Sequence, residues 1–173
     1  MRDNQPNGNP SLLPARGALH PSDAFTLLIQ TTERGHIYVL NEDENAGTLN
    51  TLFPAPFMYG GSSAVGNEEV RQIPEGSRYR LDPQSSSETL WLVWSRSPIP
   101  EFESLKHWIN PVDRGAVSAE SDRSRIHNFL VEAARSQKSS PKSAGTKLSI
   151  SGIGSRLVWK IPLVITPEPG PRE

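Results

Sequence analysis

Four histidines are the first residues to consider for chemistry, because imidazole is the commonest metal ligand and general base in proteins. They are His20, His36, His107 and His127. None has a second histidine four residues away, so no His-x-x-x-His or His-Glu-x-x-His site is present. We expect His36 at the surface, His107 packed on its neighbours or facing solvent, and His127 on the polar side of a helix. The histidines therefore predict no metal site.

Two carboxylate clusters are further candidates for chemistry. Glu42-Asp43-Glu44 is a possible calcium loop, because hard cations take several oxygens from one loop, but it lacks the spacing and glycine of an EF-hand. This pattern favours a solvated hairpin turn. Glu68-Glu69 cannot act as an acid/base pair on a strand, since neighbouring side chains there point to opposite faces.

The candidate nucleophiles lack the sequence context that catalysis requires. The chain has no cysteine, which excludes a thiol nucleophile, a Cys-ligated zinc site and disulfides together. Gly60 to Ala64 resembles a nucleophile elbow, but it is not Gly-x-Ser-x-Gly and no helix is expected after it. Gly152 to Ser155 lies between two expected strands and offers no helix N-terminus to a phosphate. We therefore expect no catalysis; a hydrolase would have to depend on Ser62 or His107.

Binding surfaces are the stronger prediction. Phe57, Met58 and Tyr59 lie together in a loop between prolines and glycines. Exposed aromatic residues on loops are typical anchors for a protein partner, so these three are the predicted partner-binding residues. The alternative is that Phe57 or Tyr59 fills the core beneath the sheet.

A second hypothesis is a small-ligand sensor whose pocket lies between the sheet and a helix. Trp91, Trp94 or Trp108 would line that pocket. Nucleic acid is not an expected partner, because 18 Lys and Arg residues balance 19 Asp and Glu residues and the net charge is −1. The lysines at 138, 142 and 147 are too few and too local to change this expectation, so we interpret them as part of a solvated linker.

Targeting features are absent from the sequence itself. No apolar run approaches the roughly 18–20 residues that span a bilayer, so no membrane insertion is expected. The first residues lack the apolar segment of a secretory signal. We expect a cytoplasmic protein if the chain is complete, and a domain excised from a larger protein could instead be extracytoplasmic.

The elements that must position these residues are mostly strands. Eight short segments have strand patterns: Phe25–Thr31, His36–Asn41, Thr48–Phe53, Glu69–Ile73, Arg78–Leu81, Leu90–Ser95, Lys147–Ile153 and Arg156–Ile165. We expect the first three to form an antiparallel meander, with Gly35 supplying a positive φ in the first turn. Leu90–Ser95 is apolar on both faces and is expected at the centre of the sheet. Pro162 places Arg156–Ile165 at an edge.

One helix interrupts the strand pattern. Ser121–Arg135 spaces its apolar residues for a single buried stripe, and its Ser- and Asp-rich start suggests a capped N-terminus. A further helical turn or two is expected over Phe102–Ile109. The fold class predicted is mainly β: an antiparallel β-sandwich of about eight strands with an inserted helix. Residues 21–166 would form this domain, with a flexible leader or linker at 1–20, a flexible connection over Ser136–Thr146 and a flexible Pro-rich tail at 167–173.

Four stretches carry a resemblance to a known family. They are Gly35–Asn41 (Gly-His-Ile-Tyr-Val-Leu-Asn), Leu52–Phe57, Ser87–Leu90 and Ser95–Pro98. In this order the chain resembles a bacterial domain-of-unknown-function family over about Phe25 to Ile165. It departs from the family pattern at His36, Ala55 and Ser85-Ser86. The resemblance implies an accessory module of the kind often appended to Ser/Thr kinases, caspase-like proteases or envelope proteins, and it carries over no catalytic residues.

The sequence thus predicts a non-catalytic module that binds another protein or another part of its own parent chain. The Phe57–Tyr59 loop is the expected surface, helped by the strand edge of Arg156–Ile165. No cofactor is predicted.

Overall fold

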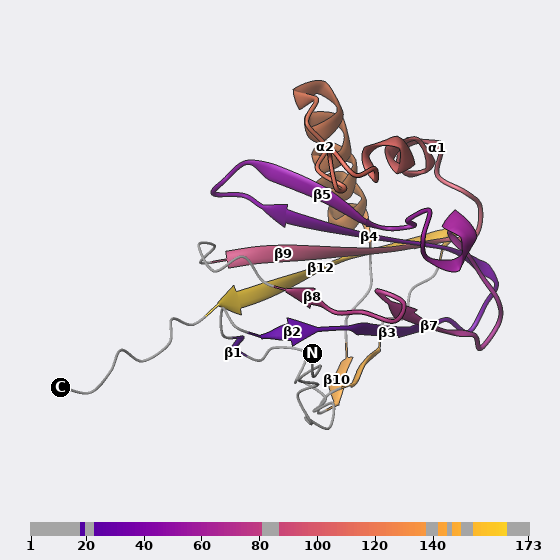
Figure 1. Ribbon diagram of the computed structural model, residues 1–173. Helices are drawn as coiled ribbons and strands as arrows, with labels where there is room; N and C mark the ends of the chain where they lie inside the picture. Colours follow the sequence, from indigo (N-terminus) through magenta and orange to yellow (C-terminus); the bar gives the residue numbers. More distant parts are fainter. Residues whose placement is uncertain are drawn as a thin grey trace, which may run out of the picture.

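A six-stranded sheet is the centre of the computed structural model, which describes residues 18–19, 23–80, 87–137, 142–144, 147–149 and 154–165. The strands lie in the order β1-β12-β9-β4-β5, and β6 pairs with one end of β4 (Figure 1). Their bounds are β1 Ala18–Leu19, β4 Gly35–Asp43, β5 Thr48–Phe53, β6 Ala64–Val65, β9 Ser87–Ser95 and β12 Arg156–Ile165. All pairs are antiparallel except the short parallel pairing of β1 with β12.

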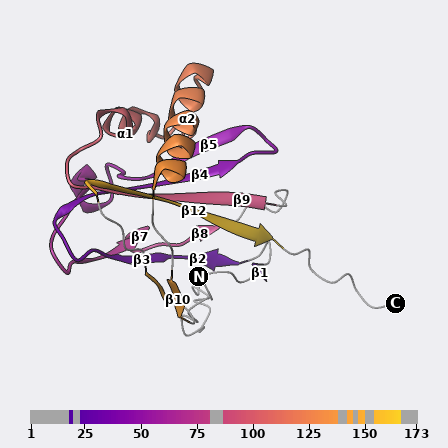
Figure 2. The ribbon, with the colours of Figure 1, turned by 180° about the vertical axis from the view of Figure 1, so that it is seen from behind.

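A second, smaller β layer covers one face of this sheet. It consists of two antiparallel pairs, in which β2 (Ala24–Phe25) pairs with β8 (Tyr79–Arg80) and β3 (Leu27–Gln30) pairs with β7 (Val70–Ile73). Figures 1 and 2 show this layer on one side of the sheet and the helices on the other. The prediction of a mainly β, sandwich-like fold with an inserted helical segment is confirmed.

The helical layer lies between β9 and β12 in the chain. It contains α1 (Pro100–Glu103), the 3₁₀ helix η2 (Ser104–Trp108) and α2 (Glu120–Ser136). Ile126 and Leu130 of α2 are buried on the sheet, which confirms the predicted stripe. The predicted side-chain cap is wrong, because the Ser and Asp residues fall inside the first turn and the N-cap is Ala119. No helix within the described residues has the length and apolarity to cross a membrane.

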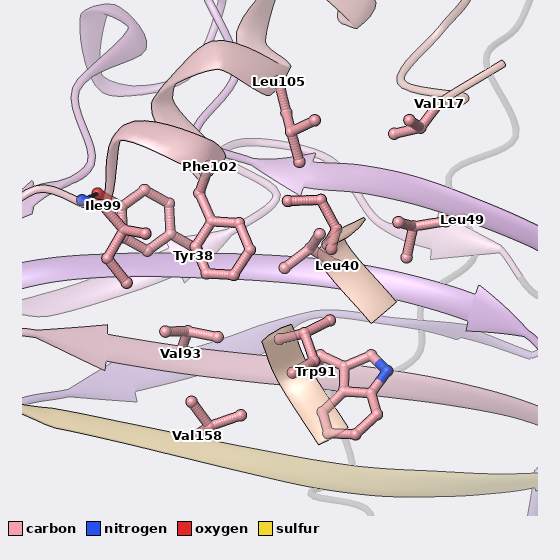
Figure 3. Close-up of a cluster of buried hydrophobic side chains, with 12 residues drawn as sticks. Tyr38, Leu40, Leu49, Trp91, Val93, Ile99, Phe102, Leu105, Val117 and Val158 are labelled. Carbon is pink, nitrogen blue, oxygen red and sulfur yellow. Dashed lines mark hydrogen bonds between the residues drawn. The ribbon is translucent and has the colours of Figure 1, made fainter. Parts of the chain in front are cut away.

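Strand β4 shows why the sheet can be buried on both faces. Ile37 and Val39 point into one hydrophobic cluster with the small β layer, and Tyr38 and Leu40 point into a second cluster beneath the helices. Figure 3 shows the second cluster, in which β9 contributes Trp91 and Val93. The central position predicted for β9 is confirmed, since it pairs with β4 on one side and with β12 on the other.

The predicted meander is wrong at its first connection. Strand β3 pairs with β7 in the small layer, so the chain crosses between layers from Gln30 to Gly35 instead of turning tightly into β4. Gly35 belongs to β4, where a Cβ atom would lie 2.5 Å from Trp94 Nε1 and 2.6 Å from the Ser95 carbonyl oxygen. Glycine is therefore required there by the close approach of β9, not by a positive φ.

The last strands differ in part from expectation. Strand β12 has the predicted bounds. Strand β11 (Lys147–Ser149) begins where predicted, and residues 150–153 lie outside the described residues. It pairs with β10 (Lys142–Ala144), so the connection predicted as flexible is wrong at these three residues. Strand β1 lies within the span predicted as a leader. The rest of that leader, the Pro-rich tail at 167–173 and parts of the connection over 136–146 lie outside the described residues.

Candidate interaction surface

The loop of residues 54–61, which we call the Phe57 loop, is fixed from below by its own side chains. Ala55 is buried, and Met58, only 2% exposed, lies in the cluster that contains Phe53. The Met58 amide donates to the Ala55 carbonyl at 2.9 Å, and the Gly61 amide donates to the Met58 carbonyl at 2.9 Å. Met58 is thus the residue that fills the core here, the role that the sequence had offered to Phe57 or Tyr59.

Tyr59 fixes the same loop from the side. Its hydroxyl accepts the Gln72 amide at 3.0 Å and donates to the Gln72 carbonyl at 3.1 Å, which connects the loop to β7. The Arg71 guanidinium lies 4.0 Å from the centre of the Tyr59 ring. The Tyr59 amide donates to a Glu75 carboxylate oxygen at 3.0 Å. With four such contacts, Tyr59 is a structural residue and is half-buried.

Phe57 directly precedes these two fixed residues and points outward, with 76% of its surface exposed. Of the three residues predicted to bind a partner, Met58 is buried and Tyr59 is hydrogen-bonded to β7. Phe57 alone exposes most of its ring to solvent. An exposed aromatic ring next to two residues that hold the loop in place is a pre-ordered contact, since little further entropy is lost when it binds.

A polar network lies where the chain leaves this loop. The buried Ser63 hydroxyl donates to Glu103, and the Tyr38 hydroxyl donates to the same carboxylate oxygen at 2.8 Å. His36 Nδ1 lies 2.9 Å from Ser63 Oγ. We assign the proton to Nδ1, because the serine proton is already directed at the carboxylate. Sequence reasoning placed His36 at the surface and missed this network, whose members come from three separate segments.

This network does not have the order of a hydrolase triad. In a triad the imidazole lies between the serine and the carboxylate, whereas here the serine lies between the other two. The residues named for a hydrolase have other partners: Ser62 Oγ accepts the Ala64 amide at 3.2 Å, and His107 lies against the Ser104 carbonyl. The geometry is that of a bridge joining β4, the segment before β6, and α1.

The bridge perturbs two ionisable groups. Burial would raise the pKa of Glu103, but hydrogen bonds from Lys106, Ser63 and Tyr38 outweigh it and hold that pKa below its usual range. Burial raises the pKa of the Tyr38 phenol to about 12, so this hydroxyl stays protonated as a donor. Tyr38 also accepts the Ile99 amide at 3.0 Å, which positions the start of α1.

The acidic cluster at 42–44 does not converge on one point. Glu42 is buried and accepts Trp91 Nε1–H at 2.8 Å and His127 Nδ1–H at 2.6 Å. Asp43 accepts the amides of the following turn, and Glu44 pairs with Lys160 at 2.6 Å. The predicted solvated turn is correct for Glu44 only, since Asp43 is the half-buried last residue of β4. Within the described ranges no group of three or more His, Cys, Asp and Glu residues could hold a metal ion.

An open groove of about 650 Å³ lies between α2 and β12. Its lining residues are Phe129, Glu132, Ala133, Ser136, Gln137, Arg156 and Val158. None of the three tryptophans named for a ligand pocket lines it. Trp91 is buried in the core, where its indole N–H is taken by Glu42.

The edge of β12, the second predicted contact surface, is largely closed. Gln137 Oε1 accepts the Val158 amide at 2.6 Å, so that amide points away from β9. By the two-residue period of a strand, the position of Pro162 faces the same way and has no N–H to offer. Strand β1 pairs with Val164 and Ile165 at the far end.

Comparison with known proteins adds no relative to this description. No family model matches the chain, and neither a curated protein nor a solved structure matches it.

Proposed function

We propose that this chain is a non-catalytic interaction module that binds another protein, or another part of its own parent chain, through Phe57. The observation that carries the proposal is the exposed Phe57 ring on a loop fixed by buried Met58 and hydrogen-bonded Tyr59. Aromatic anchors of this kind supply much of the binding energy at protein interfaces. Because the loop is already ordered, little of that energy is lost in arranging it.

The setting that we propose follows from the resemblance to bacterial accessory domains. Such a module would act beside a larger catalytic or envelope protein. Its own groups would supply contacts rather than chemistry. The Ser63 hydroxyl, for example, is committed to the Glu103 carboxylate.

The experiment compares three forms of the chain as bait in a lysate of the native host: wild type, Phe57→Asp and Val112→Asp. Val112 is 88% exposed and lies on a different loop, so it is the matched control for adding a charge at an exposed apolar residue. Both substitutions should change the free energy of unfolding by no more than about 0.5 kcal/mol. We leave Tyr59 unchanged because its removal would also disturb β7.

The expected result is a partner retained by wild type and by Val112→Asp, and lost by Phe57→Asp. Truncating a hot spot costs about 2 kcal/mol or more, which is roughly a 30-fold loss of affinity. A partner held equally by all three folded forms would contradict the role of Phe57.

A small ligand in the α2–β12 groove is the second candidate, favoured by the apolar Phe129 and Val158 side chains at its wall. A ligand at a hundredfold excess over its dissociation constant would stabilise the fold by about 2.7 kcal/mol. A thermal-shift screen in which no compound raises the melting temperature would remove this candidate.

A further inference from the structure

Strand β3 has a sheet edge for which the described residues provide no closure. The outer edge of β5 is closed by two backbone hydrogen bonds. The Thr51 amide donates to the Gly115 carbonyl at 2.9 Å, and the Val117 amide donates to the Leu49 carbonyl at 2.9 Å. The edge of β12 is closed by Gln137, Pro162 and β1. The edge of β7 is closed at Gln72 by the Tyr59 hydroxyl.

The register of the β3–β7 pair gives the direction of the free groups. Leu28 lies opposite Gln72, whose amide and carbonyl are both taken by Tyr59 on the far side of β7. Leu28 and Gln72 are therefore a non-hydrogen-bonded pair, and the N–H and C=O of Leu28 point away from β7. The two-residue period gives Gln30 the same direction. No described strand pairs with β3 on that side, since β10 and β11 pair with each other.

The side chains of this edge are also open. Leu28 is 62% exposed, and Val70, on the same outer face of the pair, is 55% exposed. Leu27 and Ile29 point toward the core but are only half-buried, so an added strand would cover them further. Figure 1 shows β3 in the small layer, on the side of the sheet away from the helices.

Natural proteins protect exposed edges with charges, prolines or bulges. Strand β3 reads Leu-Leu-Ile-Gln and contains neither a charge nor a proline. The same chain does protect β12 with Pro162 and Gln137. Free backbone groups, exposed apolar side chains and missing protection thus occur together on one short strand.

We propose that β3 is a docking edge on which an extended peptide segment of the partner adds as a further strand. This inference rests on the proposed function, since the partner is a protein, and it names the form in which that partner binds. The chemistry of the edge selects an uncharged, apolar segment. The backbone of the docked segment hydrogen-bonds to the backbone groups of Leu28 and Gln30. One of its side chains covers Leu28, and its inward side chains cover Leu27 and Ile29.

The test uses a displayed library of random 12-residue peptides, selected on the immobilised full chain. Enriched peptides are synthesised and their affinities measured for wild type, Gln30→Pro and Gln30→Ala. Proline removes the outward N–H without breaking a bond to β7, whereas alanine removes the same side chain and keeps the N–H. Amide hydrogen exchange of the wild type is recorded with and without peptide.

We expect enriched peptides with an apolar, uncharged core that bind wild type and Gln30→Ala alike and bind Gln30→Pro at least tenfold more weakly. The Leu28 and Gln30 amides should exchange fast in the free chain and become protected by the peptide, while Ile29 is protected in both states. The inference is overturned if no peptide is enriched, if Gln30→Pro binds equally well, or if protection appears elsewhere. The exchange data need no variant, so a Gln30→Pro chain that fails to fold leaves the test intact.

The same variants separate this inference from the proposed function. A captured partner that is lost by Phe57→Asp and kept by Gln30→Pro overturns only the β3 edge. A peptide whose affinity falls in Gln30→Pro but is unchanged in Phe57→Asp supports docking on the β3 edge. The role of Phe57 is then decided by the capture experiment.

Discussion

Three consecutive residues in the Phe57 loop have three different roles. Met58 fills the core, Tyr59 bonds to β7, and Phe57 faces solvent. Composition alone identified the stretch as an aromatic loop between chain-breaking residues. It could not tell which side chain turns inward, because that depends on Gln72, Arg71 and Glu75, which are distant in sequence and come beside the loop only in the fold.

At the same scale, the lowered pKa of Glu103 predicts a pH-dependent contribution to stability. A carboxyl group whose pKa is lower in the folded state adds stability above its unfolded pKa of roughly 4.3 and loses it as the pH falls through the folded value. Hydrogen bonds to a charged group are stronger than neutral ones, so Glu103→Gln should lower the free energy of unfolding by about 1–2 kcal/mol at pH 7. Urea unfolding at pH 7 and pH 3 measures this difference.

The difference between wild type and Glu103→Gln should be smaller at pH 3 than at pH 7, because the stability contributed by the lowered pKa is lost progressively as the pH falls from the unfolded toward the folded pKa. Glu132→Gln, on the exposed face of α2, is the matched control and should show little change at either pH. A Glu103→Gln deficit that is equally large at pH 3 would contradict the role of the charge.

At the scale of elements, α2 is held to the sheet by an apolar stripe and by a polar contact between His127 and Glu42. Sequence patterns placed α2, β5 and β12 at nearly their observed bounds, because hydrophobic period is a local property. They failed for the pairing of β3, which depends on contacts with residues some forty positions later. They also missed the Glu42–His127 contact, since a polar residue on a strand usually faces water.

Removal of Glu42 should weaken the attachment of α2. Glu42→Ala leaves the buried Trp91 indole N–H without its acceptor, which costs about 2–3 kcal/mol. His127→Ala should cost about 1 kcal/mol, because the partly exposed imidazole can be replaced by water and Glu42 keeps Trp91. Urea unfolding measures the loss of unfolding free energy in both variants, which should be larger for Glu42→Ala. A loss that is equal in the two variants, or larger for His127→Ala, would show that Glu42 stabilises the fold through His127 rather than through Trp91.

At the scale of the whole molecule, one sheet is buried on both faces and leaves few places for a partner. Its helical face is covered by α1, η2 and α2, and its other face by the small β layer. The edges of β5 and β12 are bonded or blocked. Among the described residues, the Phe57 ring and the β3 edge are open. The mainly β class could be predicted from the spacing of strand patterns, whereas this distribution of open and closed surface depends on the tertiary fold.

The most direct test of the Phe57 contact is site-specific photocrosslinking in the native host. Benzoylphenylalanine replaces Phe57 in one strain and Val112 in another, and crosslinked products are identified by mass spectrometry. We predict a discrete crosslinked protein from position 57 and none from position 112, although the Val112 side chain is the more exposed of the two. The same products from both positions, or none from position 57, would contradict the proposal that Phe57 binds a partner.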